Sequence, residues 1–376
     1  MNSNEKRKVL ILTNSDSGLY DFRKELLQRL VSVGYEVIIS VPEGKYRERI
    51  EKLGCKVVPA RLERRGMNPV RDLKLLNSYV RQMKEIRPNI VLTYTVKPNI
   101  YGGIACRLSG IPYLVNITGL GTALEHPGLL KNLLLWLYRK SLSKASAVFF
   151  QNVYNKEFME SYRCGGKRNI LLPGSGVNLS DHPYREYPEE TEGIRILSVM
   201  RVMKDKGIEE LLACVPEIKK NYPSVHFAIA GAYEDESRQY YEPLINNLQE
   251  QGILRYYGYR EDLSEIMANS HIIVHPSHHE GMSNVLLEAA ACGRPVVACD
   301  IRGCIETFLP GTSGESCKKM DVESLQNAIE NILKRSVEER REMGCRGRSH
   351  VEENFDREQV ITIYCNEMRR IKDELV

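Results

Sequence analysis

Short apolar runs alternate with segments of helical periodicity along nearly the whole chain, and this alternation limits the possible folds more than any other feature. In the first half the apolar runs are Val9–Thr13, Val37–Val41, Val57–Pro59, Ile90–Thr95, Tyr113–Thr118 and Ala147–Gln151. The helical patterns between them are Tyr20–Ser32, Val70–Glu85, Asn99–Ser109 and Leu129–Ser143. Continuous apolar runs of this length are typical of strands buried on both faces, so the pattern predicts a parallel sheet between two layers of helices.

The alternation stops once and then restarts. Residues 181–193 are polar, contain two prolines and have no apolar period, which is typical of a domain edge. The strands expected after it are Arg195–Val199, His226–Gly231, Arg255–Tyr259, Ile272–Pro276 and Val296–Cys299. The helices expected there include Gly207–Asn221, Ser283–Cys292 and Val322–Lys334.

We therefore expect an α/β protein of two tandem doubly wound, Rossmann-like domains facing a central cleft. A length of 376 residues suits two domains of roughly 150 residues each. The expected divisions are 1–180 for the first domain, 181–355 for the second, and 356–376 for a C-terminal helix that packs back on the first. Ligands of such sheets bind beyond the carboxyl ends of the strands.

The charge of the chain is divided unevenly between the two expected domains. The whole sequence has 53 Lys and Arg against 49 Asp and Glu, a formal net charge of +4. Residues 1–180 hold 29 basic and 14 acidic side chains, whereas residues 181–376 hold 24 and 35. The small total argues against a chain that coats nucleic acid, and 42% hydrophobic residues exclude a disordered one. The basic first half predicts an anionic surface or ligand facing that domain.

Cysteine usage and the lengths of the apolar segments predict a cytosolic protein. None of the ten cysteines forms a C-x-x-C pair, so they are expected to be reduced packing thiols. The apolar run Val9–Leu12 is too short for a signal-peptide core of about 7–15 residues. The longest uncharged stretch, Leu108–Leu124, is broken by glycines and a proline, so no segment is expected to span a bilayer.

The most informative segment for function is residues 275–295, which ends a buried strand and begins a helix. Ser283 or Asn284 is expected to cap this helix, whose free N–H groups would favour an anion at the edge of the second sheet. Glu280 precedes the helix, and Glu288 follows eight residues later, about two turns away on a similar face. Two carboxylates beside an anion site suit a nucleotide sugar. Taken alone, the pair is explained more simply as two surface glutamates.

Two strand–helix turns supply further candidate groups. Arg201 and Lys206 lie where the first strand of the second domain turns into its helix, and they can clamp a diphosphate, although a basic turn is often only a solvated loop. In the first domain, residues 13–23 offer Gly18 for a close backbone approach. Neither this turn nor residues 119–124 form a G-x-G-x-x-G motif or a P-loop, which weakens kinase-type ATP binding and a standard NAD site.

Together these motifs resemble those of the family-4 glycosyltransferases of the GT-B fold, and the resemblance runs over nearly the whole chain. The family signature of two glutamates separated by seven residues matches Glu280 and Glu288. The Arg…Lys-Gly turn of the family matches Arg201, Lys206 and Gly207. The strand–loop segment 173–178 also matches the family. Residues 96–99 and 118–121 are similar to bacterial members that extend sugars on undecaprenyl diphosphate.

The resemblance implies a role for each matched residue. Arg201, Lys206 and Glu280 would be catalytic, with the two cations neutralising the departing diphosphate and Glu280 contacting the donor sugar. Glu288 would bind the ribose hydroxyls, and Gly18 would admit the donor phosphates. The rest of the expected donor-binding set is Gly281, Ser283 and Asn284. Family members retain the anomeric configuration without a divalent metal, so neither a cofactor nor a metal site is expected.

Histidine positions raise two further questions. Many relatives carry a His after the fifth strand of the first domain, where this sequence has Thr118, so the role of that position stays open. The histidines at 271, 275, 278 and 279 suggest a metal site. However, His271 and His275 are four residues apart on a strand, about 13 Å, which is too far for one ion. His278 or His279 near the donor pocket is favoured over a metal site, and plain loop histidines are the simpler alternative.

The segment Leu129–Lys144 raises the question of a membrane surface. It holds the only Trp, Trp136, together with Arg139 and Lys140. It is too short to span a bilayer, but it can lie in the interface; the alternative is an ordinary core helix. The basic first domain favours peripheral binding at the anionic inner face of the plasma membrane, where a lipid-diphosphate acceptor would lie. The other expected acceptor or membrane contacts are Asp16, Arg23 and Lys97.

The expected activity is transfer of a sugar from a nucleotide donor, UDP-linked, to a lipid-linked saccharide in capsule, O-antigen or glycan-precursor synthesis. One alternative is a UDP-sugar 2-epimerase of the same fold, which would need acid/base carboxylates and no lipid acceptor. The other is a catalytically silent, membrane-bound scaffold, against which the intact Glu280, Glu288, Arg201 and Lys206 argue. No nucleic-acid partner is expected, and no oligomeric state follows from the sequence.

Overall fold

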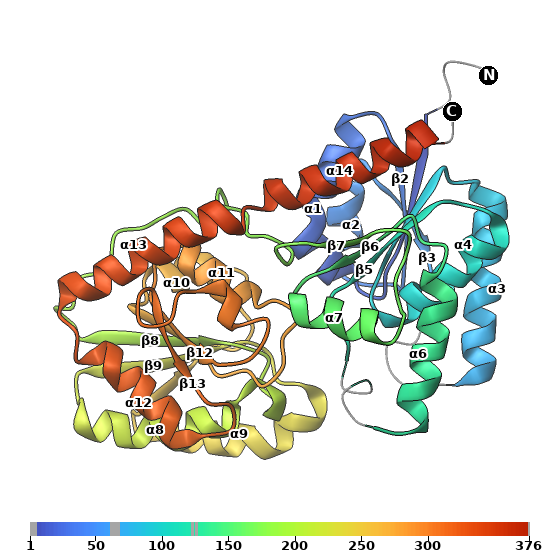
Figure 1. Cartoon of the computed structure of the whole chain (residues 1–376). Coiled ribbons are helices and arrows are strands. Elements are labelled where there is room, and N and C mark those ends of the chain that lie inside the picture. Colours follow the sequence, from blue (N-terminus) through green and yellow to red (C-terminus); the bar gives the residue numbers. More distant parts are fainter. Residues whose placement is uncertain (1–5, 61–67, 122–123, 125–126, 375–376) are drawn as a thin grey trace. The chain divides into compact units, whose positions relative to one another are not determined.

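The computed structural model describes the chain except for residues 1–5, 61–67, 122–123, 125–126 and 375–376 (Figure 1). The chain divides into two compact units, Met1–Ser175 with Gln359–Val376, and Gly176–Glu358. Each unit is built on one parallel sheet with helices on both faces, which confirms the expected α/β class and the two Rossmann-like sheets. In the described part of the chain, no helix combines the length and the apolar character needed to cross a membrane.

The first unit contains a seven-stranded sheet in the order β3-β2-β1-β4-β5-β6-β7. Its strands are β1 (Lys8–Leu12), β2 (Glu36–Val41), β3 (Lys56–Pro59), β4 (Ile90–Tyr94), β5 (Tyr113–Ile117), β6 (Ala147–Phe150) and β7 (Asn169–Leu171). All neighbours are parallel. The chain builds outward from β1 to β3 and then returns to the other side of β1 at β4. The order therefore reverses between β1 and β4, and ligands of such sheets bind at this reversal.

The helices of the first unit are α1 (Asp16–Ser32), α2 (Arg47–Glu51), α3 (Pro69–Ile86), α4 (Gly103–Ser109), α6 (Leu129–Leu142), α7 (Val153–Ser161) and α14 (Arg357–Glu374), and a π-helical turn, η1 (Pro98–Gly102), leads into α4. α14 packs beside α1 (Figure 1), with Val360, Ile361 and Tyr364 in the same apolar cluster as Leu26 and Leu27. The C-terminal helix thus completes the core on one face of the first sheet.

α1 begins at Asp16, four residues before the start expected from its apolar period. Ser15 caps it, because its side chain accepts a hydrogen bond from the N–H of Gly18 at 3.0 Å. Asp16 adds a negative charge in the first turn, which favours a helix N-terminus. Gly18 therefore lies inside the first turn of α1, and its N–H is already engaged. The structure thus places Gly18 in the helix rather than in the turn before it, and its expected role of admitting the donor phosphates stays a prediction.

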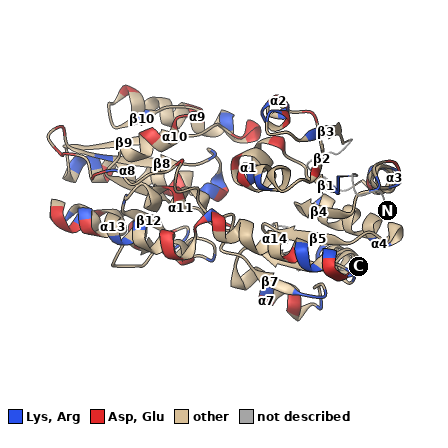
Figure 2. Ribbon diagram, turned by 90° about the horizontal axis from the view of Figure 1, so that it is seen from above, with Lys and Arg blue, Asp and Glu red and all other residues tan. Residues whose placement is uncertain are grey.

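The second unit contains a six-stranded parallel sheet in the order β10-β9-β8-β11-β12-β13, so its reversal falls between β8 and β11. Its strands are β8 (Ile194–Val199), β9 (Val225–Ala230), β10 (Leu254–Tyr256), β11 (Ile272–His275), β12 (Val296–Cys299) and β13 (Gly314–Cys317). Its helices are η2 (Lys204–Lys206), α8 (Ile208–Asn221), α9 (Asp235–Glu250), α10 (Leu263–Ala268), α11 (Asn284–Ala291), η3 (Ile305–Thr307), α12 (Val322–Leu333) and α13 (Val337–Asn354). Charges of both signs follow one another along α13 (Figure 2), where Arg348 pairs with Glu352.

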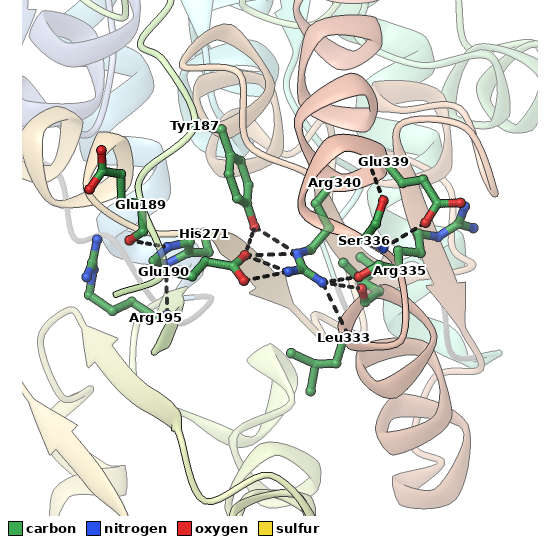
Figure 3. A network of polar contacts seen from close by, with 11 residues as sticks. Tyr187, Glu189, Glu190, Arg195, His271, Leu333, Arg335, Ser336, Glu339 and Arg340 are labelled. Carbon is green, nitrogen blue, oxygen red and sulfur yellow. Dashed lines mark hydrogen bonds and ion pairs between the residues drawn. The ribbon is translucent and has the colours of Figure 1, made fainter. Parts of the chain in front are cut away.

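The polar segment before β8 is anchored to the second unit by a buried arginine (Figure 3). Arg340 of α13 contacts both carboxylate oxygens of Glu190, at 2.6 and 2.7 Å, and the hydroxyl of Tyr187 at 3.2 Å. The ring of Tyr187 meets His271 edge-on, with centroids 5.4 Å apart. Residues 187–190 are therefore part of the fold of the second unit.

His271 makes the second unit sensitive to acid. Its Nδ1 accepts a backbone N–H of β8 and its Nε2 faces the carbonyl oxygen of Glu189, so the neutral ring satisfies both contacts. Burial, helped by Arg195, lowers the pKa of His271 to about 4. The unfolded side chain takes up its proton near pH 6.5, so the unfolded state binds more protons below that pH. The contribution of His271 to the stability of the fold is therefore fully present above about pH 6.5 and is lost as the pH falls toward 4.

We expect the free energy of unfolding to fall by an amount on the order of 3 kcal/mol between pH 6.5 and 4 through this group alone. Thermal denaturation followed by circular dichroism measures the slope, which should be smaller in His271→Gln than in the wild type. His226, an exposed histidine on β9, is the control, and His226→Gln should keep the wild-type slope. Equal slopes for all three proteins would contradict this account of His271.

Candidate active site

The expected donor-site residues gather at the carboxyl ends of β8 and β11, where the second sheet reverses its order. After β8 the chain forms the turn η2, and Gly207 leads into α8 at a φ of 74°. A Cβ at Gly207 would lie 2.0 Å from the carbonyl oxygen of Pro276. Only glycine therefore lets η2 pack against the loop that follows β11. This close approach brings Lys206 beside residues 276–283.

Glu280 is held between two nitrogen groups. Its Oε1 accepts a hydrogen bond from Lys206 Nζ at 2.5 Å and lies 2.8 Å from Nε2 of His275. The side chains of Lys206 and Glu280 are only 16% and 15% exposed, so water screens their attraction poorly. Nδ1 of His275 lies 3.2 Å from the carbonyl oxygen of Val199. Both ring nitrogens of His275 thus face oxygen atoms, one on the backbone of β8 and one on Glu280.

The environment keeps Glu280 ionised. Burial acts to raise the pKa of Glu280, but the hydrogen bonds and charges of His275 and Lys206 outweigh it and bring that pKa down to about 2. In the described part of the chain, Oε1 makes both hydrogen-bond contacts of the Glu280 carboxylate. Oε2 can therefore accept a hydroxyl group of a ligand while Oε1 keeps the side chain in place.

α11 begins directly after this carboxylate. Ser283 caps α11, as one of the two residues expected to do so, by accepting the N–H of Leu286 at 3.4 Å. Gly303 supports the approach to the helix, because its carbonyl oxygen accepts the N–H of Ser283 at 2.7 Å. Gly281 lies in this approach, Asn284 is the first residue of α11, and Glu288 lies on it, partly buried. The N-terminal N–H groups of α11 thus face the same edge of the sheet as Glu280.

Arg201 does not join Lys206 and Glu280. Its Nη1 contacts Glu234 Oε2 at 2.9 Å, and its side chain is 59% exposed. Exposed ion pairs contribute only about 0–1 kcal/mol, so a ligand phosphate can compete for this guanidinium. The structure therefore brings together Lys206 and Glu280 but leaves Arg201 on a separate partner.

The histidines near the site have separate partners. His275 contacts Glu280, and Nε2 of His278 lies 3.2 Å from Glu210 Oε2. Within the described ranges, no group of three His, Cys, Asp or Glu residues could hold a metal ion. From the sequence we considered His278 or His279 near the donor pocket, with plain loop histidines as the simpler alternative, whereas the structure places His275 on Glu280. The sequence signal that could have indicated this contact is the position of His275, which is the last residue of a buried strand and lies five residues before Glu280.

The expected acceptor residues lie around the reversal of the first sheet, at the ends of β1 and β4. The carboxylate of Asp16 accepts two backbone N–H groups at 2.8 Å. Lys97 pairs with Asp72 at 3.0 Å in a largely buried ion pair. Arg23 is buried, and its guanidinium lies 5.5 Å from the ring centre of Tyr94. Arg23 is thus an interior group of the first unit, and its use as a membrane-surface contact is wrong.

α6 has apolar side chains on two opposite sides. Its buried side is formed by Leu134, Leu135, Tyr138 and Leu142. On the other side Leu129, Leu133 and Trp136 are between 46% and 90% exposed, and their spacing places them on one face. Lys140 Nζ lies 5.9 Å from the Trp136 ring, and Arg139 donates to a backbone carbonyl at the end of α7. One side of α6 therefore packs in the core while the other presents apolar groups to the outside.

Two family models match the chain. The "Glycosyl transferase 4-like" model matches residues 8–152, and the "Glycosyl transferases group 1" model matches residues 184–350. This chain belongs to the glycosyltransferase family. The two matches fall on the first and second sheets respectively, so the glycosyltransferase has one family domain for each sheet.

Relatives of known function cover most of the glycosyltransferase. The N,N'-diacetylbacillosaminyl-diphospho-undecaprenol alpha-1,3-N-acetylgalactosaminyltransferase of Campylobacter jejuni is 25% identical over 342 residues, which are 87% of this chain and 89% of that protein. The capsular polysaccharide biosynthesis glycosyltransferase CapM of Staphylococcus aureus is 25% identical over 333 residues, or 85% and 86% of the two chains.

Solved structures establish the GT-B fold of the glycosyltransferase. HepE of Anabaena, in complex with UDP and glucose, superposes with a TM-score of 0.79 at 16% identity, over 97% of this chain and 100% of that one. Sucrose-phosphate synthase of Thermosynechococcus elongatus superposes with a TM-score of 0.80 at 19% identity, over 98% and 100%.

Proposed function

We propose that the glycosyltransferase moves a sugar from a UDP-linked donor to a lipid-diphosphate-linked saccharide, with retention of anomeric configuration and without a divalent metal. The observation that carries this proposal is the ionised Glu280, fixed by Lys206 at the reversal of the second sheet and followed by the N-terminus of α11. A nucleotide sugar needs an acceptor for sugar hydroxyls next to positive charge for its diphosphate.

The reaction develops negative charge on the leaving diphosphate as the bond from the anomeric carbon to the phosphate oxygen breaks. Lys206 and the N–H groups of α11 can stabilise that charge, and the exposed Arg201 can exchange its partner Glu234 for a phosphate oxygen. These groups would supply the neutralisation that a divalent ion supplies in other enzymes. The acceptor oxygen forms the new bond on the same face of the sugar, and its proton passes to the leaving phosphate.

The comparisons support the choice of donor and acceptor. HepE of Anabaena is described in complex with UDP and glucose, and the pneumococcal O-GlcNAc transferase GtfA in complex with UDP and GlcNAc. The Campylobacter jejuni relative is named for an acceptor on diphospho-undecaprenol. The direct test is transfer from a panel of UDP and GDP sugars to a lipid-diphosphate monosaccharide, with NMR of the product to read the anomeric configuration.

The outer side of α6 supports a peripheral membrane position. Its exposed face carries Leu129, Leu133 and Trp136, with Lys140 close to the indole. Apolar groups that enter the interface and cations that meet anionic headgroups are the two requirements of such binding. A position at the inner face of the plasma membrane would place the enzyme where lipid-linked acceptors lie.

We expect the wild-type protein to co-sediment with phosphatidylglycerol liposomes at low salt, and the bound fraction to fall at high salt. The double variant Leu133→Glu, Trp136→Ala should reduce the bound fraction at least about fivefold, because it removes apolar area and adds a repelled charge. Leu244→Glu, at an exposed leucine of α9, is the matched control and should bind like the wild type. Absence of wild-type binding at low salt would rule out the membrane position.

A further inference from the structure

Four arginines are buried in the described part of the chain. Arg294 and Arg23 each keep one buried nitrogen without a hydrogen-bond partner, and Arg23 makes the fewest hydrogen bonds of the four. Arg340 has a carboxylate partner, Glu190 (Figure 3). Arg294 donates to three backbone carbonyls, and Arg357 donates from Nε and Nη2 to the carbonyl of Gly176. Arg23 donates only through Nη1, at 2.7 Å, to the carbonyl of the preceding residue. Its Nε is buried without a hydrogen-bond partner, and no described residue forms an ion pair with it.

A buried guanidinium without a counter-ion is costly, because its lost hydration is not replaced. The helical spacing of Leu19, Arg23, Leu26 and Leu30 places Arg23 on the stripe of α1 that faces the sheet. An apolar side chain at this position would continue that stripe without the cost. Local conflicts of this kind are expected at functional sites, where a ligand completes the missing contacts.

Three neighbouring polar atoms also make no hydrogen bond of ordinary geometry. They are the hydroxyl of Tyr94, the hydroxyl of Thr95 and Oδ1 of Asn116, all buried. Tyr94 and Asn116 are paired in register on β4 and β5, so their side chains lie on the same face of the sheet. Asn116 Nδ2 donates to the hydroxyl of Tyr364 at 2.5 Å. Burial raises the pKa of Tyr94 well above its usual value; the charge and weak hydrogen bonding of Tyr364 raise it further, and those of Arg23 lower it.

The backbone at this point is also unusual. Thr95, a β-branched residue, has a φ of 71°, a conformation that costs strain and that concentrates at ligand sites. The π-helical turn η1 begins three residues later, and such turns are frequent at functional sites. Thr95 is partly exposed at the carboxyl end of β4. The cluster therefore lies directly beneath the edge of the sheet where its strand order reverses.

We propose that Arg23, Tyr94 and Thr95 bind a phosphoryl group of the acceptor in the first unit. The site would offer one positive charge, the Nε–H of Arg23 and two hydroxyl donors, which match the oxygens of a phosphate. This assignment rests on the proposed function for the identity of the acceptor, a lipid diphosphate. The same oxygens could come from free pyrophosphate, so the test compares both sources.

The first arm measures stability without ligand. Arg23→Met keeps the apolar stem and removes the unpaired charge, so we expect its Tm to rise by about 3 °C or more. Arg340→Met, the matched control, leaves the partly buried Glu190 without its arginine and should lower the Tm by at least as much. A lower Tm for Arg23→Met would show that Arg23 is a structural residue and would overturn the proposal.

The second arm titrates a short-chain isoprenyl diphosphate, and separately inorganic pyrophosphate, into protein saturated with UDP. We expect Arg23→Met to weaken isoprenyl diphosphate binding at least about tenfold and to leave the affinity for UDP unchanged. Arg23→Lys should restore part of the affinity for isoprenyl diphosphate.

Tighter wild-type binding of isoprenyl diphosphate than of pyrophosphate supports the lipid-linked source. Equal affinities would overturn that source but keep a phosphoryl site. Unchanged isoprenyl diphosphate affinity in Arg23→Met would overturn the site, whereas failure of UDP to bind would count against the proposed function alone.

Discussion

Lys206→Ala is expected to abolish the stabilisation of the protein by UDP and to lower turnover by about two orders of magnitude or more. Lys206 supplies the cation at the reversal of the second sheet, where it contacts Glu280 Oε1 at 2.5 Å. Without Lys206, the diphosphate lies near the ionised Glu280 with no lysine to offset the repulsion, and His275 is the remaining contact of that carboxylate. UDP at one hundred times its dissociation constant should stabilise the wild type by about 2.7 kcal/mol. Differential scanning fluorimetry with UDP, GDP and NAD measures the loss, and only UDP should shift the wild-type Tm.

Lys204→Ala is the matched control for this variant. Lys204 lies in the same turn, η2, but its side chain is exposed and pairs with Glu209 at 3.2 Å. It should keep the UDP shift and keep turnover within about twofold, because exposed ion pairs contribute little. An undiminished UDP shift in Lys206→Ala would remove the assignment of Lys206 to the diphosphate.

Glu280→Gln is expected to lower turnover at least about one-hundredfold while UDP still binds within about threefold of the wild-type affinity. The change keeps the shape of the side chain, but it removes the charge that both Lys206 and His275 contact. In our account this carboxylate accepts hydroxyls of the donor sugar, which UDP lacks. Turnover is measured by transfer of labelled sugar, and UDP affinity by calorimetry.

Glu288→Gln should give the opposite result, because we assign Glu288 to the ribose hydroxyls. We expect UDP affinity to fall at least about tenfold.

The pH dependence of Glu280 adds a further check. Since the pKa of Glu280 lies near 2, its ionised form persists well below pH 4.5, and its contribution to stability is lost only as the pH falls from about 4.5 toward 2. Full turnover in Glu280→Gln would contradict the sugar contact.

The buried strands could be predicted from the sequence because burial on both faces requires continuous apolar runs. β7 and β13 were not predicted because they lack such runs. Each lies at an edge of its sheet, and β13 includes Glu315 and Ser316, so neither needs an apolar run. The start of α1 was missed because the apolar period begins later than the cap at Ser15, which depends on a side-chain hydrogen bond.

The site could be predicted in part. The motif placed Lys206, Glu280 and Ser283 at one edge of the second sheet, because the carboxyl ends of parallel strands share that edge. It did not reveal the contact of His275 with Glu280, which depends on how the loop after β11 folds back. Arg201 pairs with Glu234, 33 residues away, and no local pattern indicates such a contact. The burial of Arg23 was readable from its helical spacing with three leucines of α1.

Transfer of labelled sugar from UDP sugars to a lipid-diphosphate monosaccharide tests the central claim most directly. We predict transfer from a UDP-linked donor, undiminished by EDTA, with the anomeric configuration of the donor retained in the product. We also predict loss of that transfer in Glu280→Gln and Lys206→Ala but not in Lys204→Ala. Binding of UDP without transfer to any lipid-linked acceptor, or a product of inverted configuration, would contradict the account.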